Sequence, residues 1–114
     1  MTHTVDELYQ KVVSRIKADP STSYTAQLLD SGTGEVARKV GEEALETVIE
    51  ALIGSKENLI KESADLIYHL TVLWVSSGID SQEVWNELKN RSTISGLEEK
   101  RARRDREKDL GVGV

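Results

Sequence analysis

The chain has 114 residues, a formal net charge of −5 and no cysteine. A chain of this length forms one domain with a modest core, so we expect a second copy to help bury its apolar surface. The acidic balance argues against a nucleic-acid partner, and the missing cysteines exclude disulfides and thiolate metal sites. Neither a membrane-spanning apolar run nor a signal pattern is present, so we expect a cytoplasmic protein without membrane contact.

One proline and little alternation of apolar and polar residues indicate a helical chain. The apolar periodicity predicts five helices, over about 4–18, 24–29, 35–53, 56–76 and 80–89. Thr4 and Glu7 are expected to form a capping box for the first helix, and Gly54 a left-handed cap that ends the third. From Ser92 onward an irregular segment is expected to lead into a highly charged tail.

These elements predict an all-α fold, a single helical-bundle domain over residues 1–104 built on a central antiparallel helix pair. Residues 105–114 are polar and end in Gly-Val-Gly-Val, so we expect a charged, flexible C-terminal tail. Basic and acidic residues are interleaved around this tail, which indicates a solvated or frayed helix and argues against RNA contact.

Four carboxylates stand in two pairs at i, i+3 spacing, Glu43 with Glu46 and Glu62 with Asp65. On a helix each pair shares one face, where like charges repel unless solvent or a cation relieves them. The first pair lies on an acidic stripe that would equally suit an ordinary amphipathic helix. The second lies in a helix that is apolar nearly all round and is therefore predicted to be buried, where unpaired carboxylates are costly.

Two antiparallel helices joined by a short turn bring these pairs together and predict an oxygen-only site for Mg²⁺, with Mn²⁺ as the alternative. A metal ion there polarises phosphoryl oxygens, which indicates hydrolytic phosphate chemistry. His69 lies one turn beyond Asp65 and is expected to support the site rather than to bind metal. Glu42 lies off the stripe, where it is either solvated or assists the metal.

The Glu43-x-x-Glu46 and Glu62-x-x-Asp65 motif resembles that of the all-alpha, MazG-like nucleotide pyrophosphohydrolases. The surrounding segments resemble those of the phosphoribosyl-ATP pyrophosphohydrolase family, which acts in the second step of histidine biosynthesis; they are residues 23–29, 39–44, 62–70 and 95–100. The resemblance implies hydrolysis of 1-(5-phosphoribosyl)-ATP to 1-(5-phosphoribosyl)-AMP and diphosphate. It also implies an intertwined homodimer.

The resemblance places the catalytic and metal-binding roles on Glu43, Glu46, Glu62 and Asp65. Either Glu43 or Glu46 is the candidate to take a proton from the attacking water. The residues expected to bind substrate are Tyr24, Lys39 and Lys100, which match other positions of the family's motifs, and Arg91.

Two alternative functions remain open. A house-cleaning nucleoside triphosphate pyrophosphohydrolase would share the fold, the metal and the bond cleaved, and differ in the base and sugar it accepts. Residues 95–100 argue against this alternative. A non-enzymatic helical adaptor would spread its acids over solvent-facing surfaces instead of pairing them on a mostly apolar hairpin.

Overall fold

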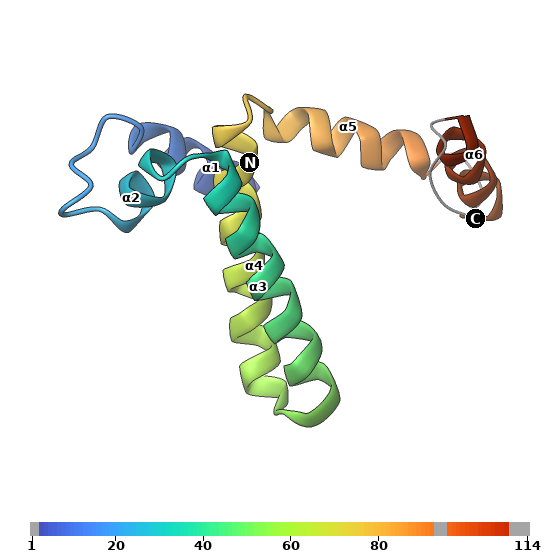
Figure 1. The fold of residues 1–114 in the computed structure, drawn as a ribbon, viewed down its shortest axis with the longest axis horizontal. Helices are drawn as coiled ribbons and strands as arrows, with labels where there is room; N and C mark the ends of the chain where they lie inside the picture. Colours follow the sequence, from blue (N-terminus) through green and yellow to red (C-terminus); the bar gives the residue numbers. More distant parts are fainter. Residues whose placement is uncertain (1–2, 93–95, 110–114) are drawn as a thin grey trace. The chain divides into compact units, whose positions relative to one another are not determined.

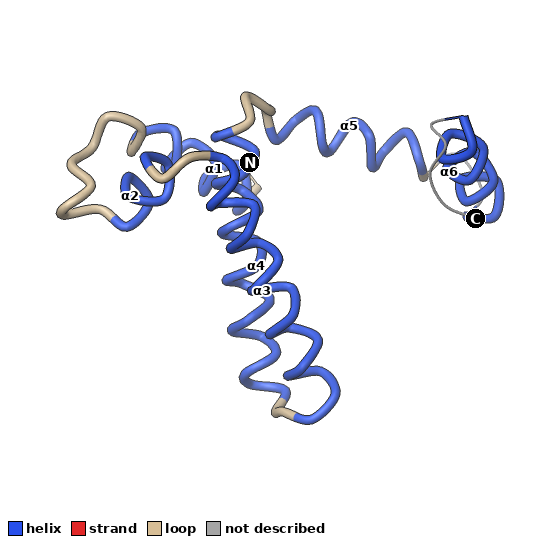
Figure 2. The backbone as a smooth tube through the Cα atoms, in the orientation of Figure 1, coloured by secondary structure: helices blue, strands red, loops and turns tan. Residues whose placement is uncertain are grey.

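The computed structural model describes residues 3–92 and 96–109, and these residues form helices and loops without a strand (Figure 2). The helices are α1 (Thr4–Ser14), α2 (Tyr24–Asp30), α3 (Thr33–Ile53), α4 (Lys56–Ser76), α5 (Ser81–Arg91) and α6 (Gly96–Asp109). The all-α prediction is therefore confirmed. The chain divides into two compact units, Met1–Ser81 and Gln82–Val114, which are described separately below. None of the described helices has the length and apolar character needed to cross a membrane.

Helices α3 and α4 form a long hairpin in the first unit and lie side by side (Figure 1). Ser55 caps the N-terminus of α4, and its side chain accepts a hydrogen bond from the Asn58 N–H at 3.1 Å. Gly54 has a φ of −102°, so the predicted left-handed cap is wrong and the turn is extended at this residue. A Cβ atom at this position would lie 2.9 Å from the Glu50 Cα atom, which favours glycine there.

The core of the first unit lies at the end of the hairpin that is farther from its turn. Each of the four helices α1 to α4 contributes one buried apolar residue to it, namely Val12, Leu28, Val36 and Val72. Within the described range 41–67 no residue is fully buried. The prediction that α4 is buried all round is therefore wrong for its first half. Helices α1 and α2 cover only the core end, so the first half of α4 is covered mainly by α3.

Helix α1 begins and ends differently from the prediction. His3 is its N-cap, with Nδ1 accepting from the Val5 N–H at 3.1 Å, so the predicted capping box is wrong. Thr4 is already the first helical residue, one position too late for its hydroxyl to cap the helix. The helix ends at Ser14 instead of near Ala18, because the chain tightens there into i→i+3 hydrogen bonds.

The second unit contains α5 and α6. The expected irregular segment after Ser92 is wrong from Gly96 onward, because α6 runs from that residue to Asp109. Its charged residues and alanine are strong helix formers, which explains a helix without an apolar stripe. Residues 93–95 and 110–114 lie outside the described part. The division of the chain at residue 105 stays a prediction.

Candidate functional site

The α3–α4 hairpin has one acidic face. At 100° per residue each helix turns one side toward its neighbour, a second side carries the paired carboxylates, and a third carries exposed apolar residues. Because the two helices run antiparallel, their acidic sides meet on one face of the hairpin and their apolar sides on the opposite face. Local periodicity thus assembles a polar site from residues 16 or more positions apart in the sequence.

Glu43, Glu62 and Asp65 form the centre of this face. One carboxylate oxygen of each lies within 4.8 Å of those of the other two. The fourth predicted carboxylate, Glu46, is exposed and lies close enough to Glu62 to accept a hydrogen bond from it when Glu62 is protonated. The structure thus brings together the four carboxylates that the spacing singled out.

The four charges are poorly compensated by the protein itself. The Oε2 atoms of Glu43 and Glu62 are buried without a hydrogen-bond partner. The hydrogen bond with Glu46, burial and the neighbouring Glu43 together raise the pKa of Glu62 to about 7. Within the described residues none of the four carboxylates forms an ion pair with a lysine or arginine. A hard cation that takes oxygen ligands, such as Mg²⁺ or Mn²⁺, fits this donor set.

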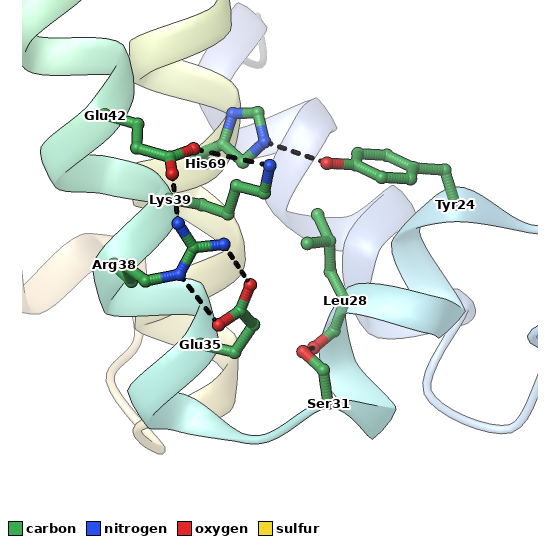
Figure 3. A network of polar contacts seen from close by, with 8 residues as sticks. All are labelled: Tyr24, Leu28, Ser31, Glu35, Arg38, Lys39, Glu42 and His69. Carbon is green, nitrogen blue, oxygen red and sulfur yellow. Dashed lines mark hydrogen bonds and ion pairs between the residues drawn. The ribbon is translucent and has the colours of Figure 1, made fainter.

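Glu42 belongs to a different cluster on α3 (Figure 3). Arg38 binds both Glu35, at 2.5 and 2.9 Å, and Glu42. Lys39 Nζ lies 3.4 Å from Glu42 Oε2. Burial opposes the charge of Glu42, but the contacts with Lys39 and Arg38 outweigh it and lower the pKa of this carboxyl. Glu42 is therefore neutralised by lysine and arginine, unlike its neighbour Glu43.

Two further polar residues, one on each helix of the hairpin, lie one turn from the carboxylates toward the core, and a third residue contacts one of them. Lys39 precedes Glu43 by one turn of α3. His69 follows Asp65 by one turn of α4, is buried, and has Nδ1 2.8 Å from the Asp65 carbonyl oxygen. Tyr24, at the start of α2, has its hydroxyl 3.3 Å from Nε2 of His69 (Figure 3). The contact between Tyr24 and His69 escaped sequence analysis, because no local pattern links residues 45 positions apart.

The two remaining predicted site residues belong to the second unit. Arg91 donates from Nε to Glu87 Oε1 at 3.0 Å within α5. Lys100 lies along α6, where it lines a hollow together with Arg103, Arg104 and Glu107. Their part in binding substrate stays a prediction.

Comparison with known proteins gives a consistent result. Residues 5–92 match the family model described as phosphoribosyl-ATP pyrophosphohydrolase. The chain is 53% identical over 100 residues to a phosphoribosyl-ATP pyrophosphatase of Azospirillum brasilense. The aligned residues are 88% of this chain and 90% of the relative. A phosphoribosyl-ATP pyrophosphatase of Trichlorobacter lovleyi is 48% identical over 103 residues, covering 90% of this chain and 95% of the relative.

A third relative, a phosphoribosyl-ATP pyrophosphatase of Granulibacter bethesdensis, is 52% identical over 99 residues, which are 87% of this chain and 62% of the relative. The family match contains the four carboxylates, Lys39 and Tyr24. Residues 95–100, whose sequence resembles the end of the family's pattern, lie beyond the matched range, and Ser95 lies outside the described residues. The match covers most of the chain and the whole carboxylate-bearing hairpin, and the chain therefore belongs to the phosphoribosyl-ATP pyrophosphohydrolase family.

Proposed function

We propose that this chain hydrolyses 1-(5-phosphoribosyl)-ATP between its α and β phosphates, giving 1-(5-phosphoribosyl)-AMP and diphosphate, in the second step of histidine biosynthesis. The observation that carries the proposal is the group formed by Glu43, Glu62 and Asp65 in a chain of this family. A non-enzymatic adaptor has no reason to hold three carboxylates within 4.8 Å of one another, two of them with a buried, unpartnered oxygen.

We assign the metal-binding role to Glu43, Glu62 and Asp65, with Glu46 beside them. Bound Mg²⁺, or Mn²⁺ in its place, would neutralise charge on the phosphates and polarise the phosphoryl group. Glu46 is exposed and lies outside the tight group of three, so its carboxylate is free to accept the proton of an attacking water. Glu46 neighbours Glu62, so this proposed base lies beside the proposed metal ligands.

The charges along the acidic face give the substrate a direction. Lys39 lies toward the core end of the hairpin, whereas Glu50 lies toward its turn and has a buried, unpartnered oxygen of its own. A polyphosphate is attracted to the first and repelled by the second. We therefore infer that the nucleotide extends from the carboxylates toward Lys39 and Tyr24. Arg91 and Lys100 remain proposed phosphate contacts.

We also propose that the active species is a homodimer. A single chain leaves large apolar residues exposed on the face of the hairpin opposite the acids: Leu45, Val48, Ile49, Leu52, Ile60 and Ile67. Such a patch is unusual on a monomer and fits a protein interface. A second copy placed there leaves the acidic face open to substrate.

The test is product analysis. Purified protein with Mg²⁺ should convert phosphoribosyl-ATP to phosphoribosyl-AMP and release diphosphate, with EDTA abolishing turnover and Mg²⁺ restoring it. ATP and dATP should be poorer substrates, because contacts with the additional phosphoribosyl group help to hold the reacting phosphates in place. Chromatography of the nucleotides and a diphosphate-specific assay measure both products.

The outcomes separate the alternatives. Equal or faster cleavage of ATP or dATP would favour a house-cleaning pyrophosphohydrolase. Release of single phosphate would exclude both enzymes. An adaptor would show no turnover and no thermal stabilisation by Mg²⁺.

A further inference from the structure

His69 has a defined arrangement of protons. Its Nδ1 lies 2.8 Å from the backbone carbonyl oxygen of Asp65, and a carbonyl oxygen can only accept a hydrogen bond. Nδ1 therefore carries the proton, and in the neutral ring Nε2 presents a lone pair. The ring is 6% exposed and stands edge-on to Tyr68, with ring centroids 5.0 Å apart, so packing holds this orientation.

The lone pair of His69 determines what Tyr24 can offer. The Tyr24 hydroxyl lies 3.3 Å from Nε2 and must donate its one proton there. Its oxygen then presents only lone pairs to any other group. His69 is the single hydrogen-bond partner of this hydroxyl among the described residues, and Tyr24 is 51% exposed. A half-exposed tyrosine is thus fixed as an acceptor.

The Tyr24 ring is also held in place. It lies nearly parallel to the Tyr68 ring, with centroids 6.3 Å apart and an interplanar angle of 21°. The Tyr68 hydroxyl is in turn hydrogen-bonded to Thr25 Oγ1 at 2.5 Å, which ties the first turn of α2 to α4. Holding an exposed side chain in one orientation costs conformational entropy, and a contact with a ligand would offset that cost.

This arrangement lies beside the carboxylate group. The step from Asp65 to His69 on α4 and the step from Glu43 to Lys39 on α3 run in the same direction, because the helices are antiparallel. Each step is one helical turn, about 5–6 Å. A nucleotide whose phosphates lie at the carboxylates and extend toward Lys39 brings its sugar and base to Tyr24.

We propose that His69 is a positioning residue that fixes the Tyr24 hydroxyl as a hydrogen-bond acceptor for a hydroxyl or amino group in the nucleoside part of the substrate. The proposal rests on the proposed function, because it uses the direction of the nucleotide inferred above. It assigns Tyr24 and His69 to substrate binding and not to the chemical step.

His69 touches two groups, and two substitutions separate them. In His69→Gln the longer side chain can place its amide oxygen where Nε2 was and still accept a hydrogen bond from Tyr24. The donor that Nδ1 of His69 supplied to the Asp65 carbonyl is then lost. In His69→Asn the amide nitrogen can replace Nδ1 and donate to Asp65, but nothing reaches Tyr24. If His69 acts through Tyr24, Gln rescues function and Asn does not; if it acts through Asp65, the order is reversed.

Steady-state kinetics with phosphoribosyl-ATP and saturating Mg²⁺ provide the first test. Tyr24→Phe and His69→Asn should each raise KM roughly three- to tenfold, the loss expected for one hydrogen bond, with kcat within about twofold of wild type. His69→Gln should keep KM close to wild type. The double variant Tyr24→Phe/His69→Asn should be no worse than either single variant, because both remove the same contact.

Contrary results have a clear meaning. A wild-type KM in His69→Asn, or an equal rise in His69→Gln, would overturn the proposal. A fall in kcat together with a higher Mg²⁺ requirement in His69→Gln would place the role of His69 at Asp65 instead.

Imidazole ¹⁵N NMR of the full chain tests the proposal without turnover. Wild type should show a protonated Nδ1 and a hydrogen-bonded Nε2 for His69, and Tyr24→Phe should move the Nε2 resonance downfield while leaving Nδ1 protonated. His3 is the internal reference, because it lies far from Tyr24 in sequence and caps α1. A protonated Nε2 in wild type would overturn the proposal. If wild type failed to hydrolyse phosphoribosyl-ATP, the proposed function would fall while this spectrum still decided the His69–Tyr24 contact.

Discussion

At the scale of single residues, the folded, metal-free protein disfavours the charged form of Glu62. Glu46, burial and Glu43 raise the pKa of Glu62 to about 7, above its ordinary value of 4.5. The folded, metal-free protein therefore binds a proton at Glu62 more tightly than the unfolded chain does. Stability from this proton is fully present below about pH 4.5 and is lost as the pH rises through about 7.

The metal-free protein should accordingly melt at a lower temperature at about pH 8 than at about pH 5. Mg²⁺ should raise the melting temperature more at the higher pH, because protons and the cation compete for the same carboxylates. Differential scanning calorimetry in EDTA and in Mg²⁺ measures both effects. Glu62→Gln should flatten the metal-free pH dependence, and an unchanged slope in this variant would assign the effect to other groups.

Substitution of the proposed metal ligands should separate activity from stability. Glu62→Gln and Asp65→Asn should each reduce turnover roughly 100-fold or more, above the 10–100-fold typical of residues that only support a ligand. The metal-free melting temperature should hold or rise, because a repelling charge is removed. Glu57→Gln is the matched control, since Glu57 is an exposed carboxylate on the same helix, and its ion-pair partner within the described part of the chain is Lys61. Full activity in either ligand variant would remove that residue from the site.

The site could be predicted from the sequence as far as helix periodicity reaches. Glu43 with Glu46, and Glu62 with Asp65, share a face because i and i+3 lie together on any helix. The pairing of Arg38 with Glu42 follows the same local rule, and it could have shown that Glu42 is neutralised. The contact of Tyr24 with His69 could not be predicted, because it depends on how α2 packs against α4.

At the scale of elements, the long helices were predictable, whereas the caps of α1 and α3 and the C-terminal end of α1 were not. Helix α4 runs from Lys56 to Ser76 as the apolar pattern indicated, because many residues contribute to that pattern. A helix end depends on one or two residues, as the cap at His3 shows, where the ring accepts a hydrogen bond from the Val5 N–H. The start of α6 at Gly96 was missed for a related reason, since a helix without an apolar stripe gives no periodic signal, and the interleaved charges indicated only a solvated or frayed helix near the tail.

Helix α6 also bears on the C-terminal tail. Deletion of residues 106–114 should leave kcat and KM within about twofold of wild type, because the unit that bears the carboxylates ends before α6 and the deletion removes only the last turn of α6 and the residues after it. A deletion that starts at Lys100 is the comparison, since it also removes a proposed phosphate contact and should raise KM. A large fall in kcat for the shorter deletion, with helical content unchanged by circular dichroism, would mean that the tail acts on bound substrate.

At the scale of the whole molecule, the exposed apolar face of the hairpin remains to be covered. Its residues follow helical spacing on both helices, at 45, 48, 49 and 52 on α3 and at 60 and 67 on α4. A face made of two antiparallel helices is similar when viewed from either end, so it suits packing against its own copy around a two-fold axis. Two hairpins joined in this way form a four-helix bundle.

We therefore expect the purified protein to have the mass of a dimer by light scattering, and Leu52→Lys to shift it to the mass of a monomer. Leu52 is 77% exposed in the single chain, so a lysine there adds no strain to the monomer but places a charge in the interface. Ile16→Lys is the control, because Ile16 is also apolar and 54% exposed but lies outside the hairpin. A monomeric wild type, or a Leu52→Lys variant that stays dimeric, would show that this face does not hold the second copy.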